Sequence, residues 1–166
     1  GMRLIFDSQQ AGVDPLGPQS IVAIGTGPLT GSPAIIGSRF AVMGKSPISA
    51  TWGDANSGGY FGPALKRSGY DMVFLVGASQ TPVYLVIHDG RAEIRDASDL
   101  WGMTTYQVDE ILRSRHGRDA QVACIGPAGE RGSLISCIIH DGGRAAARSG
   151  FGAVLGSKKI KAVVVR

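Results

Sequence analysis

Cysteine is scarce in this sequence, and that scarcity excludes several kinds of metal centre. The 166 residues contain two cysteines, Cys124 and Cys137, and no Cys-x-x-Cys pair. A structural zinc site or an iron–sulfur cluster needs several cysteine or histidine ligands at short spacings. We therefore expect no such centre within this chain, and we expect both thiols to be buried in the core.

Long apolar runs are also absent. No stretch approaches the roughly 20 apolar residues that a bilayer-spanning helix needs, and no apolar leader stands at the start. The sequence therefore predicts a cytoplasmic protein with no membrane partner.

Aromatic residues make up only 7% of the chain and do not interleave with its basic residues. The formal net charge of +4 is spread along the sequence, so nucleic-acid binding is not expected. The densest basic run is Lys158-Lys159-Ile160-Lys161, which we interpret as a solvated helix end.

Glycine, by contrast, is abundant, with 25 residues and no collagen-like period, which predicts many turns. The segment from Gly143 to Lys159 combines several glycines with Arg144 and Arg148. Arginine matches phosphate oxygens, and glycine lets backbone amides approach a bulky anion, so this segment predicts an anion site. Its glycine spacing matches neither a P-loop nor Gly-x-Gly-x-x-Gly, so a set of plain tight turns remains the alternative.

Short apolar runs rich in β-branched residues predict strands over residues 21–24, 40–43, 72–76, 83–87, 122–125, 135–139 and 162–165. The Asp89-Gly90 pair between apolar segments predicts a hairpin with a two-residue type I′ turn. Helices are expected over residues 105–116, where Thr104 and Gln107 have capping-box spacing, and over residues 62–68.

The sequence also repeats itself. Phe61-Gly62-Pro63-Ala64-Leu65 is echoed by Phe151-Gly152-Ala153-Val154-Leu155. The echo predicts a single domain over residues 1–166 built from a duplicated unit, with halves of roughly 1–77 and 78–166. At this offset Asn56 falls opposite Ala146, so the turn at 56–59 and the turn at 144–150 become equivalent loops that could clamp one ligand.

Ordered motifs along nearly the whole chain resemble the N-terminal domain of the aldehyde:ferredoxin oxidoreductases, the tungsten or molybdenum bis-pterin enzymes. The motifs are Val13-Asp14-Pro15-Leu16-Gly17-Pro18, Thr26-Gly27-Pro28-Leu29-Thr30-Gly31, Lys45-Ser46-Pro47, Asn56-Ser57-Gly58-Gly59-Tyr60-Phe61-Gly62, Gly69-Tyr70-Asp71, Ile125-Gly126-Pro127-Ala128-Gly129-Glu130 and the run from Arg144 to Lys158. The resemblance implies an α+β fold in which two packed β-sheets form a base for the metallopterin, with a few short helices.

The resemblance also implies the cofactor contacts. Carried over by motif, they are Arg39, Asn56, Gly58, Arg144, Ala145, Ala147 and Arg148. A magnesium ion that bridges the pterin phosphates would take the side-chain oxygen of Asn56 and the backbone carbonyl of Ala145, which suits a hard ion that prefers oxygen ligands. Without the resemblance, Asn56 would be read as a turn cap and the arginines as exposed surface residues.

The chain departs from the family pattern in places. Ala147 and Ser149 stand where the family usually has glycine, which puts the contact at Ala147 in question. The family's opening strands would precede Met2, and its iron–sulfur cysteines and later pterin motifs would follow Arg166. Of the histidines, only His140 lies near the predicted site, and we expect it to be a bystander, so no catalytic residue is assigned.

Two functions of different classes remain open. The first is the cofactor base of a tungsten- or molybdenum-dependent oxidoreductase that oxidises aldehydes to carboxylic acids and passes electrons through a [4Fe-4S] cluster in its other domains to ferredoxin. On this reading the chain alone is inactive, its partners are ferredoxin and the following domains, and a homodimer is possible. The second is a stand-alone, non-enzymatic pterin or phosphate carrier, or an assembly protein. The intact mass of the native protein distinguishes them.

Overall fold

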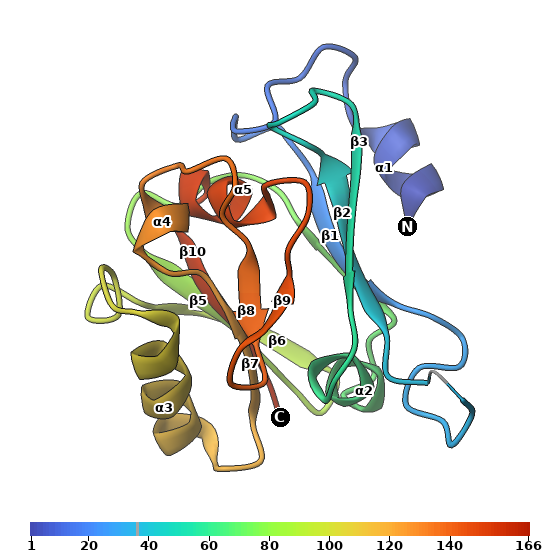
Figure 1. Ribbon diagram of the computed structural model, residues 1–166, viewed down its shortest axis with the longest axis vertical. Coiled ribbons are helices and arrows are strands. Elements are labelled where there is room, and N and C mark those ends of the chain that lie inside the picture. Colours follow the sequence, from blue (N-terminus) through green and yellow to red (C-terminus); the bar gives the residue numbers. More distant parts are fainter. Residues whose placement is uncertain (36) are drawn as a thin grey trace.

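The computed structural model describes residues 1–35 and 37–166 as two β-sheets with five short helices around them (Figure 1). The first sheet has the strand order β3 (Trp52–Ser57), β2 (Phe40–Lys45), β1 (Val22–Thr26) and β4 (Met72–Leu75). The second has the order β6 (Arg91–Asp96), β5 (Val83–His88), β10 (Ile160–Val165), β7 (Gln121–Cys124), β8 (Ile138–His140) and β9 (Arg144–Ala146). The expected α+β fold with two packed sheets is confirmed.

The two sheets share one topology. In the first sheet, β1, β2 and β3 form an antiparallel meander, α2 (Phe61–Arg67) follows, and β4 returns beside β1. In the second, β7, β8 and β9 form the same meander, α5 (Phe151–Ser157) follows, and β10 returns beside β7. The hairpin of β5 and β6 extends the second sheet, because β5 pairs in parallel with β10. This matched order agrees with a duplicated unit.

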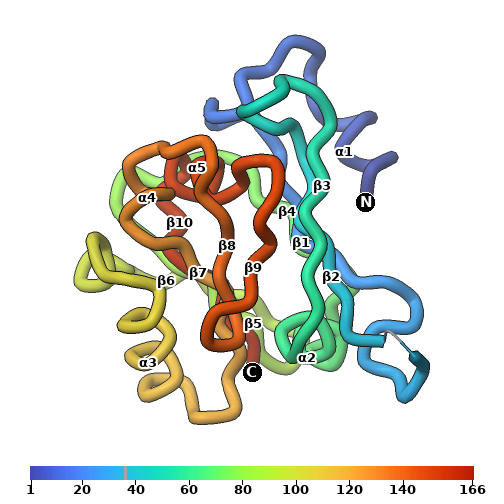
Figure 2. The backbone as a smooth tube through the Cα atoms, viewed as in Figure 1, coloured from blue at the N-terminus to red at the C-terminus, as the bar shows by residue number. Residues whose placement is uncertain are grey.

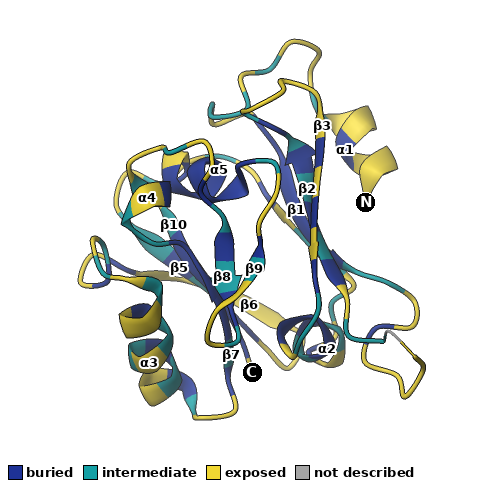
Figure 3. Ribbon diagram, viewed as in Figure 1, coloured by how far each residue is buried: buried dark blue, intermediate teal, exposed yellow. Residues whose placement is uncertain are grey.

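The main core lies between the sheets, where buried residues from both of them meet α2 and α5 (Figure 3). Phe61 and Phe151, which the sequence echo places at equivalent positions, begin these two helices and are completely buried. Burying a large aromatic side chain is among the strongest single stabilising contributions to a core. The repeated Phe-Gly motif is therefore a packing motif that fixes each helix against both sheets.

The other helices cover outer surfaces. The helix α3 (Thr105–His116) buries Val108 and Leu112 in a second core, and its capping box from Thr104 to Gln107 is formed as expected. Of the two remaining helices, α1 (Met2–Ser8) packs Ile5 on the first sheet, and α4 (Pro127–Glu130) packs against α5.

The predicted hairpin is confirmed. His88 pairs with Arg91 across the two-residue turn, and both turn residues have positive φ, 47° at Asp89 and 72° at Gly90. These angles are those of a type I′ turn, which matches the twist of the flanking strands.

Three local expectations are wrong. The strand expected over 135–139 begins only at Ile138, because Ser136 turns back to bond the carbonyl of Ser133. Cys124 is buried as expected, but Cys137 is only half-buried. The basic run is not a solvated helix end, since Lys158 and Lys161 are 1% and 0% exposed.

A candidate anion site where the two sheets meet

The edge strands β3 and β9 contact one another, so the loops that follow and precede them come together (Figure 2). The Ser149 hydroxyl donates to the Asp54 carbonyl at 3.4 Å, and the Ser46 hydroxyl donates to the Ser149 carbonyl at 3.1 Å. At the other end, His140 Nε2 lies 2.8 Å from the Ser57 hydroxyl. The Asn56 turn thus faces the β8–β9 turn and the start of β9, whereas the turn at 147–150, which the sequence echo had paired with it, lies at the other end of β3.

A cavity of about 680 Å³ opens between the Asn56 turn and the start of β9. It contains five of the predicted cofactor contacts, and its full lining is Ser38, Arg39, Asn56, Ser57, Gly58, Gly59, Tyr60, Arg144 and Ala145. The other two predicted contacts, Ala147 and Arg148, are exposed and lie outside this lining. An adjoining hollow of about 620 Å³ over the outer face of the first sheet shares Arg39 and Asn56 with the cavity.

The cavity carries the positive charge of two exposed arginines, with the Asp141 carboxylate buried behind it near Arg144. Arg39 and Arg144 are exposed, and neither forms a salt bridge with a carboxylate within residues 1–35 and 37–166. Arg39 Nη1 donates to Asn56 Oδ1 at 2.6 Å, which orients its guanidinium and leaves its other N–H donors available. Planar forks of this kind bind phosphate oxygens in pairs.

The donors around the cavity suit a phosphate better than a bare metal ion. The described residues contain no group of three or more His, Cys, Asp or Glu side chains that could hold a metal. The amide oxygen of Asn56 and the carbonyl of Ala145 would fit a magnesium ion only if phosphates supplied most of its remaining ligands. Arg39 would then have to release Asn56, which it can do by turning to the phosphate.

Gly59 sets how close the turn can come to the other loop. Its φ is +131°, and a Cβ built there would lie 2.0 Å from Asp141 Oδ2. A larger residue would displace the Asp141 and Arg144 side chains, and the positive φ favours glycine at this position whatever the space. Gly58 is less constrained, since its added Cβ would meet only the Ser38 hydroxyl at 3.3 Å.

Two residues behind the cavity were not predicted. His140, expected to be a bystander, is 2% exposed, and Asp141 Oδ2 accepts the Tyr60 backbone N–H at 2.6 Å. Burial raises the pKa of the Asp141 carboxyl, but the contact with His140, the Tyr60 amide and the nearby charges outweigh it, so that the pKa lies below its usual value. The sequence signal was present, because His140-Asp141-Gly142 repeats the His88-Asp89-Gly90 of the predicted hairpin.

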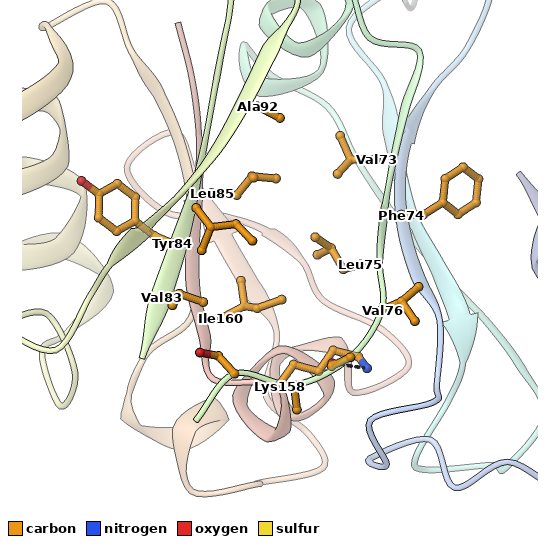
Figure 4. A pocket seen from close by; sticks show the side chains of 14 residues that line it. Val73, Phe74, Leu75, Val76, Val83, Tyr84, Leu85, Ala92, Lys158 and Ile160 are labelled. Atoms are coloured by element: carbon orange, nitrogen blue, oxygen red, sulfur yellow. Dashed lines mark hydrogen bonds between the residues drawn. The ribbon is translucent and has the colours of Figure 1, made fainter. Parts of the chain in front are cut away.

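A separate apolar cavity of about 520 Å³ lies between β4 and the hairpin of β5 and β6. Val73 and Leu75 face Leu85 and Ile160 across it, and Lys158 stands at one end (Figure 4). Its lining offers little to a charged ligand.

No helix among the described residues is long and apolar enough to span a bilayer.

Residues 1–166 match the family model described as aldehyde ferredoxin oxidoreductase, N-terminal domain. The chain belongs to this family. It is 44% identical to the tungsten-containing aldehyde ferredoxin oxidoreductase of Pyrococcus abyssi, over 100% of the chain and 28% of that protein. It is 35% identical to the aliphatic sulfonate oxidoreductase, WOR-like subunit of Pyrococcus furiosus, over 93% of the chain and 26% of that subunit.

A solved structure agrees with this family assignment. The chain is 37% identical to a chain of the active site complex BamBC of benzoyl coenzyme A reductase in complex with 1,5-dienoyl-CoA, with a TM-score of 0.95. The match covers 99% of this chain and 25% of that one. This member of the aldehyde ferredoxin oxidoreductase family thus spans about a quarter of the length of the relatives it matches.

Proposed function

We propose that this chain is the metallopterin-binding base of a larger, cytoplasmic tungsten- or molybdenum-dependent oxidoreductase. The observation that carries the proposal is the cavity between the Asn56 turn and the start of β9, which holds two exposed arginines that form no salt bridge within residues 1–35 and 37–166. Exposed arginines beside a glycine turn suit the phosphates of a pterin cofactor. The names of the relatives, which include tungsten-containing enzymes, support the choice of cofactor.

The residues divide the binding between two loops. Arg39 and Arg144 neutralise phosphate charge, and the Gly58 backbone lets the ligand approach. Asn56 and the Ala145 carbonyl would hold a magnesium ion together with the phosphates. Ala147 and Arg148, outside the cavity, would reach only a ligand that extends along β9. When bound, the metallopterin supplies the redox chemistry, and the chain supplies charge and orientation.

The reaction proposed for the whole protein is oxidation of an aldehyde to a carboxylic acid, with electrons passed through a [4Fe-4S] cluster in other domains to ferredoxin. The aldehyde ferredoxin oxidoreductase named among the relatives supports this choice. Other relatives are named for sulfonate or glyceraldehyde-3-phosphate oxidation, so substrate choice would lie in regions outside these 166 residues. We assign no catalytic acid or base to this chain, and we expect it to be inactive by itself.

The first prediction tests the cavity. In the full-length protein, Arg144→Ala and Arg39→Ala should each lower the ratio of bound tungsten or molybdenum to protein about tenfold after gel filtration, because each removes a fork of phosphate donors. Metal is measured by mass spectrometry, and pterin by the fluorescence of its oxidation product.

The matched control is Arg91→Ala, which removes an exposed arginine from β6. This strand is the edge of the second sheet opposite to β9. Arg91→Ala should leave metal and pterin content unchanged. Unchanged content in both Arg39→Ala and Arg144→Ala would contradict the proposed function.

A further inference from the structure

The chain contains the sequence His-Asp-Gly twice, each time in the turn of a hairpin. The aspartates have the same unusual backbone, with φ of 47° at Asp89 and 48° at Asp141. In both turns the carboxylate lies beside Nδ1 of the preceding histidine, at 3.1 Å in the first and 3.3 Å in the second. The two copies therefore share their local chemistry.

Their surroundings differ. The side chains of His88 and Asp89 are 47% and 85% exposed, whereas those of His140 and Asp141 are 0% and 5% exposed. The second copy is packed against the Asn56–Tyr60 turn, where Asp141 Oδ2 accepts the Tyr60 N–H at 2.6 Å and His140 Nε2 contacts the Ser57 hydroxyl at 2.8 Å. Two polar cross-links thus join the loops on either side of the cavity.

The burial of this pair is unfavourable in isolation. Asp141 Oδ1 and His140 Nδ1 are buried and find no aligned hydrogen-bond partner in the described part of the chain. Buried polar atoms without partners destabilise a fold. A carboxylate beside Arg144 would also weaken a simple anion site. The first copy shows that a His-Asp-Gly turn forms without any such contacts, so turn formation alone does not explain them.

What the second copy adds is a fixed spacing between the loops. The position that a Gly59 Cβ would take lies 2.0 Å from Asp141 Oδ2 and 2.9 Å from Arg144 Cδ, so these three residues converge. Asp141 bonds to the residue after Gly59 and precedes Arg144 by three positions. It is therefore placed to hold the Asn56 loop against the Arg144 loop.

We propose that Asp141, supported by His140, is a positioning residue of the anion site, which sets the separation at which both loops hold one phosphate-bearing ligand. This inference rests on the proposed function. Asp141 is buried and is not part of the cavity lining, so it acts on the ligand only through the loops that it joins.

The experiment uses the purified full-length holoprotein with Asp141→Ala, Asp141→Asn, Asp89→Ala and Arg144→Ala. Tungsten, molybdenum and pterin content are followed over time after gel filtration at a temperature where each variant is folded. Hydrogen exchange of the peptide that contains Tyr60 reports the turn itself. Asp141→Ala should release metal and pterin about tenfold faster and exchange faster at Tyr60, because it leaves that amide without an acceptor.

The other variants separate the explanations. Asp141→Asn keeps an acceptor oxygen and should restore most of the retention and protection. Asp89→Ala removes the same group from the exposed copy and should behave as the parent protein. If Asp141→Ala yields no folded protein, Ser57→Ala, which removes the contact with His140 and a weak 3.5 Å bond to the Gly58 carbonyl, should still give faster release.

Two results would count against different claims. If Arg144→Ala releases the cofactor while Asp141→Ala and Ser57→Ala retain it as the parent does, the positioning role is overturned and the proposed function stands. If Arg144→Ala also retains the cofactor as the parent does, the proposed function itself is contradicted.

Discussion

Lys161 is a lysine without access to solvent, held by the Glu130 carboxylate and by the Met103 carbonyl at 2.9 Å. Glu130 in turn accepts the Gly102 backbone N–H at 2.8 Å. These bonds link α4, which carries Glu130, to β10, which carries Lys161, and to the loop before α3. Removing one member of a buried ion pair leaves the other charge without compensation, which costs several kcal/mol.

A second prediction follows for Lys161→Met. It should lower the free energy of unfolding by about 3–5 kcal/mol, because Glu130 stays buried without its partner. Thermal unfolding measures the loss. Lys159→Met, at an exposed neighbour with the same residue change, is the control and should shift the midpoint only slightly. Equal effects of the two changes would show that the Glu130 pair is not stabilising.

Cysteine reactivity gives a third prediction. Burial raises the pKa of the Cys124 thiol to about 12, and burial also raises that of Cys137, which is half-buried. Only the thiolate attacks iodoacetamide, so at pH 8 the native protein should be alkylated slowly at Cys137 and hardly at all at Cys124. Peptide mass spectrometry reads both sites. In urea the two should react equally, and rapid native labelling of Cys124 would contradict its burial.

The Asp141 carboxyl gives a fourth prediction, for stability against pH. Its pKa is lower in the folded state than in the unfolded chain, so its contribution is present above the unfolded pKa and is lost as pH falls through the folded one. The stability difference between the parent and Asp141→Asn should therefore be constant from about pH 5 to 8 and shrink below about pH 4. A stability difference that grows as the pH falls would contradict the lowered pKa of Asp141.

At the scale of elements, the closest packing is between α4 and α5. A Cβ built at Gly156 would lie 2.0 Å from the Gly129 carbonyl oxygen, and one built at Gly129 would lie 2.8 Å from the Gly152 carbonyl oxygen. Backbone therefore meets backbone along this contact. Gly152 and Gly156, which the sequence analysis placed in the anion segment, serve helix packing here instead.

A fifth prediction concerns Gly156→Ala. Alanine favours a helix over glycine by about 1 kcal/mol, but the new methyl group would overlap a carbonyl and force the helices apart. We expect the steric overlap to outweigh the gain in helix propensity, so the midpoint of thermal unfolding should fall. Ser157→Ala, at the next and exposed position of α5, should leave it nearly unchanged. A more stable Gly156→Ala would show that α4 can move freely.

The sequence predicted the central elements better than those that carry the site. The runs that became β1, β5 and β10 are rich in β-branched residues, and α3 has its capping box. The edge strands β3 and β9 have little intrinsic strand preference, and they form because β2 and β8 offer backbone partners. The partners of His140 and Asp141 lie about 80 residues away, a separation that local patterns do not encode.

At the scale of the whole molecule, the duplication echo and the family motifs located five of the cavity residues before any geometry was known. The echo placed the turn at 56–59 and the turn at 144–150 at equivalent positions, but residues 144–146 form β9, and the cavity is lined by the start of that strand and not by the turn at 147–150. Arg148 was located by motif alone, and the cavity does not include it. Burial of Lys158 and Lys161 was missed because lysines are mostly exposed.

The contact between β3 and β9 joins the third strand of one sheet unit to the third strand of the other. Equivalent surfaces that meet each other are the mark of an isologous interface, the kind that relates two subunits by a twofold axis. The site thus lies where corresponding edge strands of the two sheets meet. A ligand in the cavity would therefore contact both sheets at once, so a change in the packing of either sheet should alter its binding.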